Sequence, residues 1–354
     1  MSSIAVRKRL VTGGVDTHGR THHAAVLDET GRILGDQQFV ASAAGYRALL
    51  GWLRGFGRLM RVGVEGTGSY GAGLARHLSD QGLTVVEVDR PDRKTRRRQG
   101  KSDPIDAISA ARATLSGHAT GTPKTRNGPV EAIRVMRVAR RGAVKARTAA
   151  INQLHGLIVA APEVLRTTLT GLPTAALIPA CTALEINENT LTDPVAATRA
   201  ALATIATRIH TLDTEIALAD RRLRPAVTAT APRLIALPGV GPETAGQLLA
   251  TAGDNPERLR SEATLAHLCG AAPIPASSGR TDRHRLHRGG DRAANNALYI
   301  IALSRMRHDP RTREYVQRRT TQGLSKKDII RCLKRYIVRE IYTALIADLT
   351  ALTT

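Results

Sequence analysis

Residues 11–40 read VTGGVDTHGRTHHAAVLDETGRILGDQQFV, and this stretch decides how the first part of the chain is interpreted. Runs of β-forming residues cover 11–16, 22–28 and 32–40, separated only by short turns that contain glycine, such as Glu29-Thr30-Gly31-Arg32. Three such runs in succession predict an antiparallel meander of three strands.

After the meander, helical and β-type segments alternate. Apolar β-type runs follow at 60–65 and 83–88, and helical stretches fill 43–54, 68–81 and 103–115. Three adjacent strands followed by alternating helices and strands is the order of an RNase H-like (RuvC-like) α/β fold. We therefore expect one α/β domain over residues 1–120.

The rest of the chain is predicted to be helical. A linker rich in proline, glycine and lysine, Gly117 to Pro129, precedes two long helices within residues 121–231. The second long helix carries a heptad seam of apolar residues: Leu202, Ile205, Ile209, Leu212, Ile216, Ala219 and Leu223. Its partner is either a helix of the same chain or another subunit. Residues 232–354 are expected to form a compact helical domain.

The composition favours a polyanionic partner. The 354 residues hold 52 Lys+Arg against 30 Asp+Glu, a formal net charge of +22. Nucleic acid fits this charge better than a membrane, because no amphipathic anchor accompanies it. Aromatic residues make up only 3%, so contacts to the nucleic-acid backbone are expected rather than base stacking. A genome biased toward arginine is the alternative explanation.

The cysteines and the hydropathy set further limits. Only Cys181, Cys269 and Cys332 occur, without a C-x-x-C pair, so neither a disulfide framework nor a zinc ribbon is predicted. The chain shows no apolar leader and no run of membrane-spanning length, so we expect a soluble, cytoplasmic, nucleoid-associated protein that does not contact membranes.

Four acidic residues are candidates for a metal site. Asp16 lies inside the first predicted strand, Glu65 ends a later one, and Asp103 and Asp106 face the same side of a helix start. Four clustered carboxylates require cations among them, and hard oxygen ligands suit Mg²⁺. Two ions about 4 Å apart would serve phosphoryl transfer.

Each of these acids also has a structural explanation. Asp103-Pro104-Ile105-Asp106 is a good helix start, with Asp103 as the N-cap. Asp16 could cap a turn with Thr17 and Gly19, and Glu65 could be an exposed strand end.

Three basic or glycine-rich segments are candidate nucleic-acid contacts. One helix face carries the cationic stripe Arg134, Arg137, Arg141 and Lys145, which could also be a solvated face. Leu237-Pro-Gly-Val-Gly241 is typical of a helix-hairpin-helix, in which amides near Gly239 and Gly241 grip a phosphate, although a purely structural hairpin remains an alternative.

The third segment is a small-residue loop, Pro273 to Arg280, which contains Ser277 and Ser278. It is flanked by the cations Arg280, Arg283, His284, Arg285, His287 and Arg288. A hydroxyl in such surroundings could attack phosphorus, because the cations stabilise the charge of the transition state.

Taken together, the chain resembles the DEDD transposases of bacterial insertion sequences, which join a RuvC-like domain to a serine-bearing C-terminal domain. The resemblance runs over nearly the whole chain. It rests on the following segments: Gly-Val-Asp16-Thr-His, Val-Glu65-Gly-Thr-Gly-Ser-Tyr70, Lys101-Ser-Asp103-Pro-Ile-Asp106-Ala107, Leu237 to Gly241, Pro273 to Gly279 and Leu324-Ser-Lys-Lys-Asp-Ile-Ile.

The resemblance implies roles for these residues. Asp16, Glu65, Asp103 and Asp106 would bind the metal, and Ser278, or else Ser277, would form a covalent link to a cut DNA end. It further implies donor and target DNA as substrates, a bridge RNA that pairs with both, and a tetramer in which one subunit's metal site meets another's serine.

The chain departs from the family pattern after the serine. Relatives carry Lys/Arg-Gly-x-x-x-Leu-Arg, whereas this chain reads Arg288-Gly-Gly-Asp-Arg-Ala-Ala-Asn-Asn296. A phosphate contact normally made by arginine would then fall to Arg292.

Three other functions compete with recombination. A RuvC-type nuclease (junction resolvase) would use the carboxylates alone, and an architectural DNA binder would use none of them. A sugar-kinase or actin-type ATPase is suggested by Asp16-Thr-His and Leu27-Asp-Glu-Thr-Gly31, but a second Asp-x-Gly-Gly phosphate loop is missing and the charge argues against it.

Overall fold

The computed structural model describes residues 9–89, 102–280 and 284–352, so Lys101 and Arg283 of the motifs above lie outside the described residues. The chain forms two compact units. Unit 1 runs through Gly128 and also contains Ala252–Arg260, and unit 2 comprises Pro129–Thr251 and the chain from Ser261 onward. Within the described ranges, no helix is both long and apolar enough to cross a membrane.

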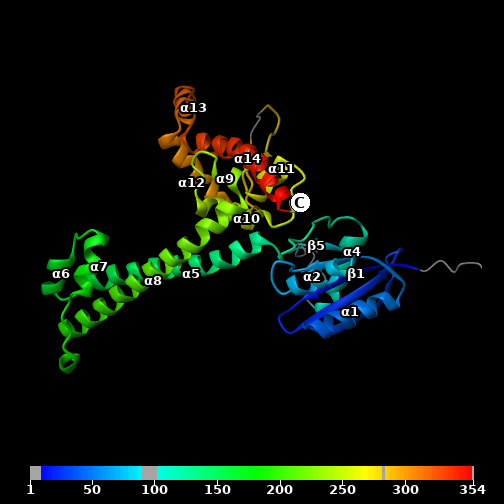
Figure 1. The fold of residues 1–354 in the computed structure, drawn as a ribbon, viewed down its shortest axis with the longest axis horizontal. Coiled ribbons are helices and arrows are strands. Elements are labelled where there is room, and N and C mark those ends of the chain that lie inside the picture. The colour runs from blue at the N-terminus through cyan, green and yellow to red at the C-terminus, as the bar shows by residue number, and fades with distance from the viewer. Residues whose placement is uncertain (1–8, 90–101, 281–283, 353–354) are drawn as a thin grey trace, which may run out of the picture. The chain divides into compact units, whose positions relative to one another are not determined.

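Unit 1 contains a five-stranded sheet in the order β3-β2-β1-β4-β5 (Figure 1). β1, β2 and β3 form an antiparallel meander, as predicted, and β4 and β5 run parallel to β1. The bounds are β1 Leu10–Thr17, β2 Thr21–Asp28, β3 Ile33–Val40, β4 Arg58–Glu65 and β5 Thr84–Val88. This mixed α/β sheet is consistent with an RNase H-like domain.

Helices cover both faces of this sheet. α1 (Ala43–Gly55) and α2 (Ala72–Asp80) bury leucines against the valines of β1 and β4 on one face. α4 (Asp103–Leu115) packs on the other face, mainly against β1 and β2.

Two glycines let α4 approach the sheet closely. A Cβ on Gly14 would lie 2.1 Å from the backbone nitrogen of Ala111, and one on Gly63 would lie 2.0 Å from Thr114 Oγ1. Any side chain at these positions would push α4 outward. The depth of α4 is therefore set by the two glycines.

The predicted linker belongs to unit 1, where residues from much later in the chain hold it. Gly121 forms a β-bridge with Glu87. Arg258, in the short 3-10 helix η2 (Pro256–Arg258), donates to the Thr122 carbonyl oxygen at 2.6 Å and lies 3.5 Å from Glu87 Oε2. Asn255 donates to the Pro123 carbonyl oxygen at 3.2 Å.

Unit 2 begins with two long helices, α5 (Pro129–Val159) and α8 (Pro194–Thr230), which lie side by side in Figure 1. The two helices run antiparallel, because a later residue of α5 contacts an earlier residue of α8: Arg140 donates to Asp220, and Arg147 donates to Asp213. Leu202 and Ile209 of the predicted seam are buried in a core shared with α5. The seam therefore has a partner within the chain. Two short helices complete this core, α6 Glu163–Leu169 and α7 Thr174–Thr182, and the 3-10 helix η1 Glu188–Thr190 follows them.

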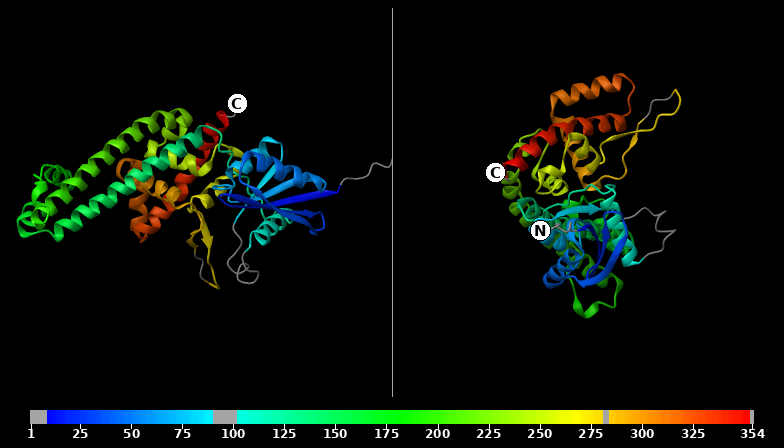
Figure 2. Two further views of the ribbon diagram at one scale, coloured as in Figure 1. Left: turned by 90° about the horizontal axis from the view of Figure 1, so that it is seen from below. Right: turned by 90° about the vertical axis from the view of Figure 1, so that its right-hand side faces the viewer.

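The remainder of unit 2 is mostly helical, as predicted. Its elements are α9 Pro232–Ile235, α10 Pro242–Ala252, α11 Glu262–Leu268, β6 Pro273–Pro275, β7 His284–Leu286, α12 Arg292–His308, α13 Pro310–Thr321 and α14 Lys326–Ala351. β6 and β7 form an antiparallel hairpin that the sequence did not predict, and Figure 2 shows it projecting from the surrounding helices. α14 is the central helix, and its buried Asp348 accepts the backbone N–H groups of Arg233 and Leu234 in α9.

Candidate functional site

The sheet edge of unit 1 brings two predicted metal ligands onto neighbouring strands. Val15 of β1 pairs with Val64 of β4 in parallel register, so Asp16 and Glu65, the next residues, follow at the same edge. Asp16 is 6% exposed and Glu65 is 8% exposed. Burial argues against the alternative that Glu65 is an exposed strand end.

The first turn of α4 supplies the other two acids. The helix begins at Asp103, and its N-cap is Ser102, so the alternative that Asp103 caps the helix is wrong. Asp106 is buried, at 4% exposure. Because α4 packs its Ala107 and Ala111 against Gly14, the preceding turn of α4 reaches the end of β1, where Asp16 lies.

His18 joins Asp16 to Asp103, and sequence reasoning assigned it no role. Its Nε2 lies 3.0 Å from Asp16 Oδ2 and 3.3 Å from Asp103 Oδ1. The ligand atoms of these three residues all lie within 4.8 Å of one another. Alternation along a strand puts residues i and i+2 on one face, so the Asp-Thr-His spacing could have indicated this contact.

The electrostatics of Asp16 fit a site for a cation. Burial raises the pKa of Asp16, and the neighbouring carboxylates Asp106 and Asp103 raise it further, while His18 lowers it. A buried carboxylate held near others is stabilised in its charged form when a cation neutralises the group. Carboxylate oxygens are also the ligands that Mg²⁺ prefers. The donor set therefore fits a divalent cation.

The candidate serines lie in unit 2, on the loop between β6 and β7. Ser277 and Ser278 are exposed, and Gly279 after them has a φ of +57°. The cations Arg280, Arg288 and Arg292 are exposed as well. The hydroxyls and the carboxylates thus belong to different units.

The residues of the cationic stripe on α5 differ in whether an acidic side chain pairs with them. Arg134 is bound to Glu131, which raises the pKa of Arg134 through their hydrogen bonds. Arg141 and Lys145 are exposed, and within the described chain no acidic partner lies in contact with either.

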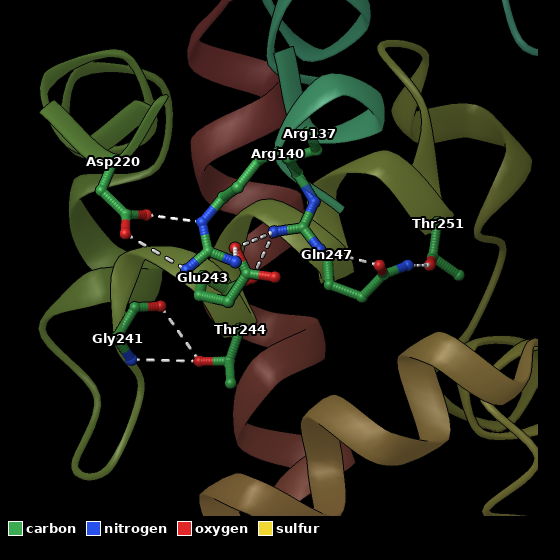
Figure 3. Close-up of polar contacts among 8 residues, drawn as sticks. All are labelled: Arg137, Arg140, Asp220, Gly241, Glu243, Thr244, Gln247 and Thr251. Carbon is green, nitrogen blue, oxygen red and sulfur yellow. Dashed lines mark hydrogen bonds and ion pairs between the residues drawn. The ribbon is translucent and has the colours of Figure 1, made fainter. Parts of the chain in front are cut away.

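Arg137 differs from the rest of the stripe because it is buried, and Figure 3 shows its polar contacts. Its Nη1 donates to the carbonyl oxygen of Glu243 and lies 2.7 Å from that residue's carboxylate, and its Nη2 donates to Gln247 at 2.9 Å. Arg140 beside it donates to Asp220 at 2.6 Å. Arg137 therefore ties α5 to α10, and its guanidinium already has partners.

The predicted helix-hairpin-helix is not confirmed. The helix before the turn, α9, has only four residues. Gly239 has a φ of +74°, and a Cβ there would lie 3.1 Å from Arg305 Cγ in α12. The Gly241 N–H donates to Thr244 Oγ1 at 3.0 Å, so that amide is occupied within the turn.

Comparisons with known proteins agree with this arrangement. A family model for IS110-type DEDD transposases matches residues 13–161, and a second, described as the transposase IS116/IS110/IS902 family, matches residues 231–317. The first range contains all four candidate carboxylates and the second contains both serines.

Two relatives come from insertion elements. The chain is 35% identical over 116 residues to an uncharacterized 43.6 kDa protein of insertion element IS110 from Streptomyces coelicolor, covering 32% of this chain and 28% of the relative. It is 32% identical over 139 residues to an uncharacterized 42 kDa protein of insertion element IS900 from Mycobacterium paratuberculosis, covering 38% and 34%. The chain thus spans about a third of the length of these curated relatives.

Proposed function

Because the chain belongs to the family of insertion-sequence DEDD transposases, we propose that it is a DNA recombinase that cuts and rejoins strands. The observation that carries this proposal is the convergence of Asp16, His18 and Asp103 at one sheet edge. The chain's net charge of +22 supports nucleic acid as its substrate. We assign the metal site to residues 1–120, the long-helix region to 121–231 and the serine to 232–354.

Asp16, Glu65, Asp103 and Asp106 would hold the divalent cations, with Mg²⁺ in a two-ion arrangement as the expected form. Such ions stabilise the attacking and the leaving oxygens of a phosphoryl transfer. The chain's contribution is to hold the carboxylates at fixed positions. Asp16 and Glu65 are fixed by the β1–β4 register, and Asp103 and Asp106 by the depth of α4.

Ser278 would be the nucleophile, with Ser277 as the alternative. Its oxygen attacks a backbone phosphorus, a phosphoserine ester forms, and the bond from that phosphorus to one sugar oxygen breaks. The serine gives up its proton, and the released sugar oxygen gains one. In the reverse sense, a sugar hydroxyl of another strand attacks the phosphoserine and restores the serine. Because one ester bond replaces another, joining requires no external energy source.

The partners would be donor DNA, target DNA and a structured bridge RNA that pairs with both. The basic residues would then hold nucleic-acid backbones, and base pairing would select the sequence. Backbone contacts are proposed for Arg134, Arg137, Arg141, Lys145, Gly239, Gly241, Arg280, Arg288 and Arg292. The least support is for Arg137 and Gly241, whose donors have partners within the fold. Assembly into a tetramer would let the serine of one subunit meet the carboxylates of another, and association with the nucleoid would follow from DNA binding.

A matched pair of serine variants tests the chemistry. Ser278→Ala should abolish strand joining and the covalent protein–DNA adduct, which denaturing gels detect as a labelled DNA that migrates with the protein. Ser277→Ala, which differs only by one position, should retain both. If Ser278→Ala behaves as the wild type and Ser277→Ala loses both, Ser277 is the nucleophile. If the double variant still cleaves DNA at the wild-type rate, the RuvC-type nuclease alternative replaces this proposal.

The metal and the RNA are tested with the same assay. RNA that copurifies with the full chain is sequenced, and DNAs that match it are supplied with Mg²⁺. Asp16→Asn should lose recombination while keeping DNA binding, because it removes one negative charge and leaves the basic surface intact. Recombination that continues in EDTA would exclude the metal site.

A further inference from the structure

One pocket of unit 2 has a lining rich in cations. It has a volume of about 410 Å³ and lies between the start of α12 and one side of α14. Its lining contains five cationic side chains and, among the described residues, no carboxylate: Arg288, Arg292, Lys327, Arg331 and Lys334. Such a concentration of one charge is stabilised when an anion binds.

Lys334 is the cation whose position is most firmly fixed. Its Nζ donates to Asn295 Oδ1 at 2.9 Å. The amide nitrogen of Asn295 donates to the carbonyl oxygens of Cys269 and Gly270, at 2.9 and 3.0 Å. Since both carbonyls accept from this nitrogen, the oxygen of Asn295 must face Lys334, so the ammonium is held at the pocket wall.

Lys334 also lacks the acidic partner that neighbouring cations have. Arg335 pairs with Glu262, Arg331 with Asp328, and Arg305 with Glu340. Over the described residues, no carboxylate contacts Lys334. Burial lowers the pKa of Lys334, and the charge of Arg331 lowers it further. Both effects would be offset by an anion in the pocket.

We propose that this pocket binds one phosphate of a nucleic-acid backbone, with Lys334 as its innermost contact. Several cations around one small site suit a phosphate, because its several oxygens can each accept a charge-assisted hydrogen bond. The identification of the phosphate as nucleic acid rests on the proposed function, whereas the anion chemistry of the pocket does not.

The pocket adjoins the hairpin whose loop carries the candidate serines. His287, the first residue after β7, lines the pocket, and the loop between β6 and β7 carries Ser277 and Ser278. A DNA or RNA strand whose phosphate is bound in this pocket, at the base of the β6–β7 hairpin, is thereby anchored near the loop that carries the serines. Of the residues that line the pocket, Arg288 and Arg292 were expected to contact nucleic acid. The pocket adds Lys327, Arg331 and Lys334 to them.

The first experiment compares two charge-neutralising variants of the full-length protein. Lys334→Gln removes the proposed contact, and Lys326→Gln removes an exposed cation of the same helix that does not line this pocket. Binding of a labelled DNA duplex and a labelled RNA is followed by fluorescence anisotropy from about 50 to 200 mM salt. Lys334→Gln should weaken binding about tenfold and reduce the slope of log K against log salt by about one. Lys326→Gln should change both much less, and Lys334→Arg should restore the slope.

The second experiment measures whether a bound ligand covers Lys334. Lysine acetylation by an activated ester is quantified by peptide mass spectrometry for the free protein, with inorganic phosphate, and with DNA. DNA should protect Lys334 and leave Lys326 reactive, with weaker protection by inorganic phosphate. The same measurement is made with RNA, and if neither bound DNA nor bound RNA protects Lys334, the pocket proposal is overturned while the proposed recombinase function stands. Protection by inorganic phosphate in a protein that binds neither DNA nor RNA overturns the nucleic-acid assignment together with the proposed function.

Discussion

Replacement of Gly14 by alanine should disrupt the proposed metal site without changing any of its proposed ligands. The new Cβ would lie 2.1 Å from the Ala111 nitrogen and 2.4 Å from the Ala107 carbonyl oxygen, both backbone atoms of α4. Since non-bonded contacts are favourable only near 3.5–4.0 Å, α4 would have to move outward by about 1 Å or more. Overpacking of this kind costs about 1–3 kcal/mol of stability.

The first turn of α4 would move with the rest of the helix, and it carries Asp103 and Asp106. Metal coordination tolerates ligand displacements of only about 0.2 Å. We therefore expect Gly14→Ala to weaken Mg²⁺ and Mn²⁺ binding by about 10- to 100-fold, the usual effect of altering a residue that supports metal ligands. Recombination should fall at least in proportion.

Isothermal titration with Mg²⁺ or Mn²⁺, together with thermal unfolding, measures both effects. Gly51→Ala is the matched control, because a Cβ on Gly51, within α1, meets nothing within 4 Å apart from its chain neighbours and the backbone of its own helix. It should leave metal binding unchanged and stabilise the protein by about 0.5–1 kcal/mol, as alanine does in a helix interior. A folded Gly14→Ala protein with wild-type metal affinity would refute the argument that the depth of α4 sets the site.

Three further results are expected. Arg137→Met should lower the free energy of unfolding by about 2–4 kcal/mol, since the Glu243 carbonyl oxygen and the Gln247 side chain lose the donor that Arg137 supplies, whereas the exposed Arg141→Met should stay within about 0.5 kcal/mol and instead weaken DNA binding; equal losses of stability in urea unfolding would contradict this contrast. Burial lowers the pKa of His22, so the unfolded chain binds a proton more readily, and stability should fall as pH drops below about 6.5. In His22→Phe, thermal unfolding should show a smaller loss of stability below about pH 6.5 than in the wild type. A pH profile identical to that of the wild type would contradict this role of His22. Asp348→Ala should cost about 2–4 kcal/mol in denaturant unfolding, because two backbone N–H groups of α9 lose their acceptor, and a loss below about 0.5 kcal/mol would show that water replaces it.

The strands of unit 1 could be predicted because half-buried strands have a period of two that is visible locally. All five runs proposed from the sequence correspond to strands in the structure. The helix expected over 68–81 begins only at Ala72, because the chain first makes a turn in which the Ser69 N–H donates to the Gly66 carbonyl oxygen. The β6–β7 hairpin was missed because Pro273 and Pro275 lack N–H groups and its strands have three residues each.

The residues of the candidate site could be predicted from the sequence where they lie on helices or strands that the sequence also predicts. Asp16, Glu65, Asp103 and Asp106 could be proposed from strand ends and a helix start. The buried position of Arg137 could not, because it depends on α10, more than a hundred residues later in the chain. The surroundings of Lys334, in which the described residues offer it Asn295 but no acidic partner, were equally inaccessible, since they come from three segments that are distant in sequence.

The segment Ala252–Arg260 limits how this protein can be divided into parts. It follows α10 of unit 2, yet Asn255 and Arg258 hold the stretch Thr122–Pro123 of unit 1. An amino-terminal fragment that stops before unit 2 would therefore lose the two side chains that hold its own end in place. For the same reason, chimaeras between relatives that are spliced at a single junction would mix two lineages within one fold. A transfer of unit 1 between relatives would therefore have to carry Ala252–Arg260 along with residues 1–128.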